Sequence, residues 1–157
     1  MQNITPFLWY DGKAEEAINH YVSIFKNSKI IKISYWGEGS PFPKGQVMTG
    51  TFELDGLRFH AFDAGPQFKF TEAISFFVDC NTQAEVDDLW EKLSAGGEKS
   101  RCGWLKDKFG ISWQIIPRVL GEWMADKDPE KSQRVMMAMM KMDKIIIADL
   151  QKAYDGK

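Results

Sequence analysis

The chain has 157 residues, of which 44% are hydrophobic and 27% are charged, and its formal net charge is −2. This length is enough to bury a core without cross-links, and the near-neutral charge excludes the basic surface of a protein that binds nucleic acid or an anionic membrane. Because the N-terminus lacks a secretory signal and no apolar stretch approaches about 20 residues, we expect a cytoplasmic protein without a membrane span whose partner is small or is another protein.

The first half of the chain predicts a strand, a helix and three further strands. Residues 3–9 are rich in β-branched and aromatic side chains, and Asp11 with Gly12 forms a turn after them. Apolar residues at helical spacing then predict a helix that ends at Asn27. The remaining strands of this half are expected at residues 30–36, 47–54 and 57–62. Residues 37–45 hold prolines and glycines and predict a loop.

The second half repeats this order. A strand is expected at residues 73–80, a helix at 82–95, and further strands up to residue 116. Thr82 and Glu85 have the spacing of a capping box, which predicts the start of that helix.

The region beyond Pro117 changes to a helical pattern. Asp128 with Pro129 is an initiation signal, and we expect a bend near Asp143 before a short final helix up to Tyr154. Four methionines are expected inside the first of these helices: Met136, Met139, Met140 and Met142. Such a methionine stripe is typical of core packing or a dimer interface, with a plastic binding surface as the alternative.

The two halves are related by a faint internal repeat. Residues 4–7 return as residues 74–77, and both segments precede a predicted helix. Each copy is too small to enclose its own apolar face, so the two copies are expected to share one surface. We therefore predict a single domain over residues 1–157, with a first module at 1–66, a second module at 70–117 and a helical extension at 118–157.

Strand alternation predicts which side chains face that shared surface. In the strand from residue 57, the side chains of Arg58, His60 and Phe62 are expected there, and Phe59 and Ala61 are expected beneath the helix. In the last strand the same rule exposes Ser112, Gln114 and Ile116 and buries Ile111, Trp113 and Ile115. The repeat then pairs His60 with Gln114, Thr5 with Ser75, and Phe7 with Phe77.

The segment at residues 102–117 resembles the second-module signature of the PhnB-like group of the vicinal oxygen chelate superfamily, which also holds glyoxalases, bleomycin-resistance proteins and extradiol dioxygenases. Residues 4–8, 14–17, 61–66 and 138–142 resemble the same group. The resemblance implies an α+β fold in which two paired βαβββ modules form a half-open mixed-sheet cup, usually completed in a homodimer.

In the enzymes of this superfamily, one residue from the first and last strand of each module binds a divalent metal. The corresponding positions here are Thr5, His60, Ser75 and Gln114. Only His60 is a good ligand and Gln114 is a weak one, because hydroxyl groups are poor partners for a transition metal. We therefore expect no bound transition metal and no other cofactor.

The expected ligand site combines aromatic side chains with a few polar groups, which is typical of a pocket for a small molecule. Its predicted residues are Thr5, Phe7, Trp9, Arg58, His60, Phe62, Ser75, Phe77 and Gln114. This composition favours binding of a partly aromatic molecule, or of an anionic one through Arg58. Two alternatives remain: a metal-dependent lyase, isomerase or dioxygenase using His60 and Gln114, and a cup filled by its own aromatic rings.

Other chemistries fit the sequence poorly. Members of this group are often labelled 3-demethylubiquinone methyltransferase-like, but no Gly-rich strand-to-helix turn for S-adenosylmethionine is present. A triad of Ser75, His60 and Asp63 lacks a nucleophile elbow, and Asp63 is expected on the opposite strand face from His60. Cys80 and Cys102 are too few for a disulfide framework and are expected to be reduced, semi-buried thiols.

Overall fold

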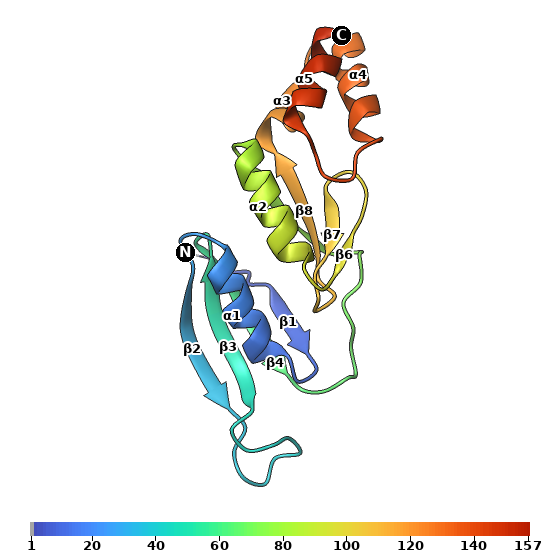
Figure 1. Cartoon of the computed structure of the whole chain (residues 1–157). Helices are drawn as coiled ribbons and strands as arrows, with labels where there is room; N and C mark the ends of the chain where they lie inside the picture. The colour runs from blue at the N-terminus through green and yellow to red at the C-terminus, as the bar shows by residue number, and fades with distance from the viewer. Residues whose placement is uncertain (1) are drawn as a thin grey trace. The chain divides into compact units, whose positions relative to one another are not determined.

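The computed structural model describes residues 2–157, and the chain divides between Lys69 and Phe70 into two compact units. Each unit contains one four-stranded mixed sheet and one long helix in the order βαβββ, and a helical extension follows the second sheet (Figure 1). The α+β class and the two βαβββ modules are therefore confirmed. Among the described residues, no helix combines the length and apolar character that crossing a membrane requires.

The first unit packs helix α1 on one face of its sheet. Its elements are β1 (Phe7–Tyr10), α1 (Ala14–Ile24), β2 (Lys29–Tyr35), β3 (Val47–Leu54) and β4 (Leu57–Asp63), and the strand order is β1-β4-β3-β2. Ile18 and Tyr21 of α1 are buried, as are Phe52 and Phe59 of the sheet. Gly50 lets α1 approach closely, because a Cβ there would lie 2.3 Å from Ile18 Cδ1. One sheet face is thus closed and the other stays open for side chains from alternate positions.

The buried carboxylate of Asp63 connects the end of β4 to the start of α1. It accepts hydrogen bonds from the backbone N–H of Gly12, at 2.6 Å, and of Ala14, at 2.9 Å. The N-cap residue Lys13 makes no side-chain capping bond, so Asp63 takes over the acceptor role that a cap residue normally has.

Strand β1 begins at Phe7, so the expectation of a strand from residue 3 is wrong. Pro6 has no N–H to donate to a ladder, although its carbonyl accepts a bond from His60 N–H at 2.9 Å. The expected loop after β2 is present, and it folds back so that Trp36 and Phe42 stack at a ring distance of 4.8 Å.

The second unit repeats the arrangement with shorter edge strands. Its elements are β5 (Ser75–Cys80), α2 (Gln83–Ser94), β6 (Glu98–Lys99), β7 (Trp104–Lys106) and β8 (Ser112–Pro117), in the strand order β5-β8-β7-β6. The capping box is confirmed, since Thr82 Oγ1 accepts from Glu85 N–H at 3.2 Å. The Glu85 carboxylate accepts in return from the N–H of Asn81. Strand β5 starts two positions later than expected, at Ser75.

Three helices form the C-terminal extension: α3 (Arg118–Met124), α4 (Pro129–Met139) and α5 (Ile147–Asp155). Leu120, Val135, Ile145 and Leu150 form a buried cluster with Ile116 of β8. The start of α4 and the break near Asp143 are confirmed, but α4 ends at Met139, so Met140 and Met142 lie outside it. The chain turns there and brings Ile145 into the cluster.

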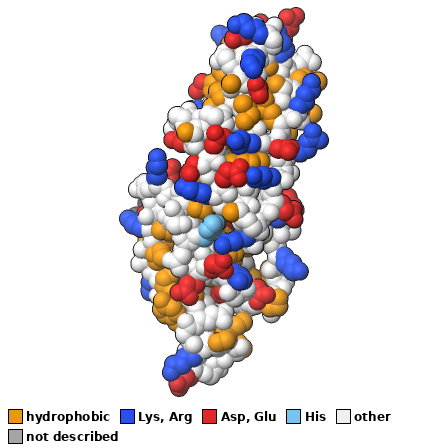
Figure 2. Space-filling view, in the orientation of Figure 1, with side chains coloured by type: hydrophobic (Ala, Val, Ile, Leu, Met, Phe, Trp, Pro, Cys, Tyr) orange, Lys and Arg blue, Asp and Glu red, His pale blue; other side chains and the backbone are white. Residues whose placement is uncertain are grey.

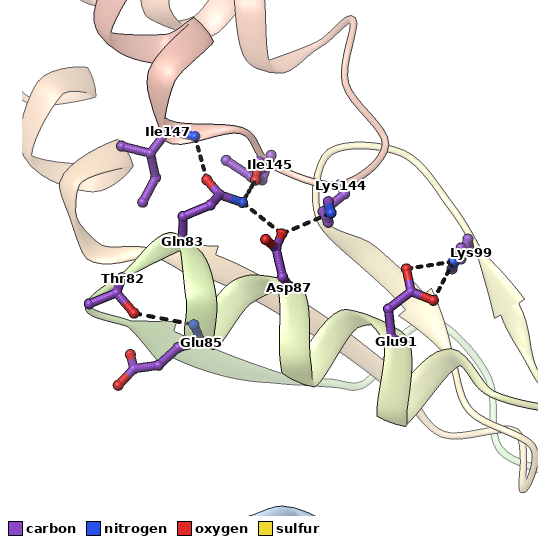
Figure 3. A network of polar contacts seen from close by, with 9 residues as sticks. All are labelled: Thr82, Gln83, Glu85, Asp87, Glu91, Lys99, Lys144, Ile145 and Ile147. Atoms are coloured by element: carbon purple, nitrogen blue, oxygen red, sulfur yellow. Dashed lines mark hydrogen bonds and ion pairs between the residues drawn. The ribbon is translucent and has the colours of Figure 1, made fainter.

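The side chain of Gln83 fastens this extension to α2 (Figure 3). Its amide nitrogen donates to the carbonyl of Ile145 at 3.0 Å, and its oxygen accepts from the N–H of Ile147 at 2.7 Å. Asp87, one turn further along α2, pairs with Lys144 at 2.8 Å, and this contact lowers the pKa of the Asp87 carboxyl. Residues 144–147 are therefore fixed on the second unit by polar contacts as well as by apolar burial.

Candidate functional site

The open face of the first sheet is aromatic. The parallel register of β1 and β4 places Phe7 beside His60 and Trp9 beside Phe62. The ring centroids of Phe7 and Phe62 are 6.0 Å apart, and Trp9 meets Phe62 edge-on at 5.0 Å. Phe7 remains 60% exposed. The structure thus brings four of the predicted residues together, on the face away from α1.

Polar groups lie on the same face in two neighbouring cross-strand rows. His60 Nδ1 lies 3.0 Å from Thr51 Oγ1 of β3, and the hydroxyl groups of Ser34 and Thr49 also contact each other. Thr5, which precedes β1, is half-buried. His60 therefore offers an imidazole that is oriented by the hydroxyl group of Thr51, an arrangement suited to hydrogen bonding with a ligand.

Arg58 already has a carboxylate partner. Its guanidinium lies 3.5 Å from Glu53 on the neighbouring strand, and Glu53 also pairs with Lys29 at 3.3 Å. All three groups are partly solvated, so each pair contributes little to stability. An anionic ligand at Arg58 would compete with Glu53.

The open face of the second sheet carries the other predicted residues. Phe77 lies beside Gln114 in the parallel register of β5 and β8. The Gln114 amide donates a hydrogen bond to Ser75 Oγ at 2.9 Å, and Phe77 is 60% exposed. Phe77 and Gln114, together with Trp104 of β7, line a cavity of about 500 Å³ within this unit. A cavity of this volume is in the range of small-molecule pockets.

Strand parity is only partly correct in β8. Gln114 is half-buried and reaches the cavity, as expected. Ser112 is only 1% exposed, and Ile116 is covered by the extension, so neither is an exposed residue of the open face. Within residues 2–157 the Ser112 hydroxyl makes no hydrogen bond. Alternation assigns a strand face correctly, but it does not report which further segments cover that face.

The residues at the expected metal positions do not suit a transition metal. The first unit supplies Thr5 and His60, and the second supplies Ser75 and Gln114, whose side chains bond to each other. In the part of the chain that the structure describes, no three His, Cys, Asp or Glu residues gather as a metal site would require. Hydroxyl and amide groups bind such ions weakly, so no reaction step is assigned to a metal here.

Two buried carboxylates that sequence reasoning did not single out as anchors have structural roles. Asp63 holds the start of α1. Asp107, also buried, accepts from Ile111 N–H at 3.0 Å and from Trp113 Nε1 at 2.9 Å. Asp107 precedes a turn and the buried strand β8, and that position was the available signal for it. Because Asp63 serves α1 on the closed face, it is not a partner for His60 in a triad.

The two cysteines are free, as expected. Cys80 is buried, and desolvation raises the pKa of its thiol to about 11. Its thiolate is therefore scarce near neutral pH, which excludes Cys80 as an activated nucleophile.

Comparison with known proteins supplies the family context. The sequence profile of the 3-demethylubiquinone-9 3-methyltransferase family matches residues 2–116. A putative 3-demethylubiquinone-9 3-methyltransferase, PhnB protein, from Bacillus cereus is 40% identical with a TM-score of 0.70, over 74% of this chain and 99% of that one. No curated protein sequence matches.

More distant structures share the fold. A protein from Pseudomonas aeruginosa is 20% identical with a TM-score of 0.63, over 74% of this chain and 98% of that one. A fosfomycin resistance protein from Listeria monocytogenes, in complex with Mn(II) and 1S,2S-dihydroxypropylphosphonic acid, is 17% identical with a TM-score of 0.50, over 72% of this chain and 90% of that one. These two structures confirm the fold that the resemblance implied.

Proposed function

This chain belongs to the 3-demethylubiquinone-9 3-methyltransferase family, and we propose that it is a binding protein. It would bind a small, partly aromatic or anionic molecule without a transition metal, as binding proteins of the same fold do. The residues proposed to contact the ligand lie on the open faces of the two sheets. In the first unit they are Thr5, Phe7, Trp9, Arg58, His60 and Phe62; in the second they are Ser75, Phe77 and Gln114. The homodimer is part of the same proposal.

Exposed aromatic rings carry this proposal. Phe7 and Phe77 occupy equivalent places in the two modules, and each remains 60% exposed beside a hydrogen-bonding side chain, His60 or Gln114. Leaving large rings exposed forfeits burial, at about 25 cal/mol per Å² of apolar surface. A ligand with a flat apolar part would recover that loss, and the adjacent imidazole and amide would orient its polar groups.

Weak donor groups argue against a metal-dependent lyase, isomerase or dioxygenase. Of the four expected positions, only His60 is a strong ligand for zinc, iron, manganese or nickel. At the second module, the Ser75 hydroxyl already accepts a hydrogen bond from Gln114 Nε2 at 2.9 Å, which leaves the Gln114 amide oxygen as the available, and weak, metal ligand.

Methyl transfer, despite the family's name, finds little support. A protein that binds S-adenosylmethionine normally cradles it with a Gly-rich turn between a strand and a helix. The turn from β1 to α1 contains one glycine, Gly12, and the turn from β5 to α2 contains none.

Elemental analysis after purification without chelators tests the metal-free proposal. We expect no stoichiometric zinc, iron, manganese or nickel. One equivalent per chain that is lost in His60→Ala would overturn the proposal in favour of the metal-dependent enzyme.

Fluorescence titration with the uncharged dye N-phenylnaphthylamine tests ligand binding. We expect saturable binding that is weakened in Gln114→Leu and in His60→Ala if both open faces contribute. Lys152→Ala, an exposed change on α5 outside the proposed site, is the control, and it should leave dye binding unchanged. Failure of the dye to bind would favour faces that are filled by the protein's own aromatic rings.

A further inference from the structure

The cavity on the second unit is built partly by the helical extension. Its sheet wall consists of Phe77, Trp104, Gln114 and Ile116. Its second wall belongs to α3 and α4 and consists of Leu120, Gly121, Glu122, Met124 and Met139, with Pro117 and Arg118 at the junction. The family profile ends at residue 116, so one wall of this cavity lies beyond the part of the chain that defines the family.

Contacts with the rest of the second unit hold the segment just after α4 in place. The N–H groups of Cys102 and Gly103 donate to the carbonyls of Met142 and Asp143, both at 2.8 Å. Gln83 fixes the next residues of the same segment, as Figure 3 shows. The apolar cluster around Ile116 seals the base of the extension. The cavity is therefore formed before any ligand arrives, which lowers the entropic cost of binding.

The residues that line the cavity determine which kinds of ligand can bind. Aromatic rings and methionine side chains both line the cavity, and thioether sulfur makes favourable contacts with aromatic groups. Two carboxylates line it, Asp79 and Glu122, but only one guanidinium, that of Arg118, which is already paired with Asp79 at 3.0 Å. The excess carboxylate disfavours an anion.

We propose that the extension makes the second sheet face a preformed site for an uncharged or cationic aromatic molecule, with Phe77 and Trp104 as the flat contacts and Gln114 as the hydrogen-bonding group. This inference rests on the proposed function, because Phe77 and Gln114 belong to both. It narrows that proposal by excluding anions from this face, and it makes α3 the element that determines specificity.

Gly121 offers a direct way to fill the cavity. A Cβ at this position of α3 would meet no atom within 4 Å, and Gly121 lines the cavity. Gly121→Trp should therefore keep the fold while its indole occupies ligand space. Affinity for N-phenylnaphthylamine should fall about tenfold or more. Ala125→Trp serves as the control. It adds the same ring at the exposed C-cap position of α3, which does not line the cavity.

Charge selection needs a second, independent variant. Anilinonaphthalene sulfonate has the same aromatic frame as N-phenylnaphthylamine plus one negative charge, and it should bind about tenfold more weakly to the unmodified protein. Glu122→Lys, an exposed change, should remove most of that difference by strengthening binding of the sulfonate.

The outcomes separate the two proposals. Dye binding that Gln114→Leu weakens but Gly121→Trp does not, with thermal unfolding unchanged, would refute the role of the extension and leave the proposed function standing. Equal affinity for the two dyes, or a preference for the sulfonate, would refute the charge selection. If neither dye binds, both proposals are wrong.

Discussion

Neighbouring residues of β8 should respond oppositely to substitution, since their side chains lie on opposite faces of the strand. Trp113 is 3% exposed and packs under α2, whereas Gln114 is half-buried at the cavity. Trp113→Ala should lower the free energy of unfolding by about 3–5 kcal/mol through lost burial. Removing the Nε1 donor to the buried Asp107 carboxylate, at 2.9 Å, should add about 1–3 kcal/mol.

Gln114→Leu should change the free energy of unfolding by less than about 1.5 kcal/mol, because it removes one hydrogen bond from a partly solvated site. Urea denaturation followed by circular dichroism measures both effects. With a slope of about 2 kcal/mol per molar urea, the Trp113→Ala midpoint should fall by about 2–4 M and the Gln114→Leu midpoint by less than about 0.75 M. Trp113→Phe separates the two contributions, since it keeps a ring and loses the donor.

A result in which Gln114→Leu is the more destabilising change would refute the assignment of faces in β8. The proposed ligand contacts of the second unit would then lose their basis. Comparable losses in both variants would have the same consequence, because they would place both side chains in the core.

Further outcomes concern the extension, one thiol and the assembly. Gln83→Ala should raise the hydrogen-exchange rate of the Ile147 amide by about tenfold, whereas the exposed control Gln133→Ala should not change it. Iodoacetamide should label Cys80 slowly at pH 8 and faster as the pH approaches the thiol pKa of about 11, and rapid labelling at pH 8 would contradict its burial. Light scattering should report about twice the chain mass of 18.0 kDa, because methionines of α4 remain exposed, and a monomer would contradict the dimer.

The expectation of a dimer rests on exposed apolar side chains of the C-terminal helices. Met136 and Met137 of α4, and Met140 just after it, are among the exposed large hydrophobic residues. Figure 2 shows hydrophobic side chains gathered over this end of the second unit, between charged groups.

The sequence was sufficient to predict those elements whose bounds depend on neighbouring residues alone. The bounds of β3 and the start of β4 were predicted correctly because Asp55 and Gly56, both with positive φ, form the tight turn between them. The start of α2 was predictable for the same reason, since Thr82 and Glu85 satisfy the first N–H groups of the helix from within the segment.

Features that depend on distant segments were not predictable in this way. The burial of Ser112 and the cover over Ile116 both depend on other parts of the second unit, and the strand pattern contains no record of them. The start of α1 depends on Asp63, which lies at the far end of the module. The candidate site shares this property: parity identified Phe77 and Gln114, but not the residues of α3 that line the same cavity.

The late position of the extension in the chain has a consequence for biosynthesis. Ile116 lies near the end of β8, and its cover comes from residues that the ribosome adds afterwards, as late as Leu150. Until those residues emerge, the apolar side chain of Ile116 on the nascent sheet stays uncovered, a state that favours chaperone contact or aggregation. Substitutions of the buried α5 residue Leu150 are therefore expected to lower the yield of folded protein in cells more than they lower the equilibrium stability of protein that has already folded.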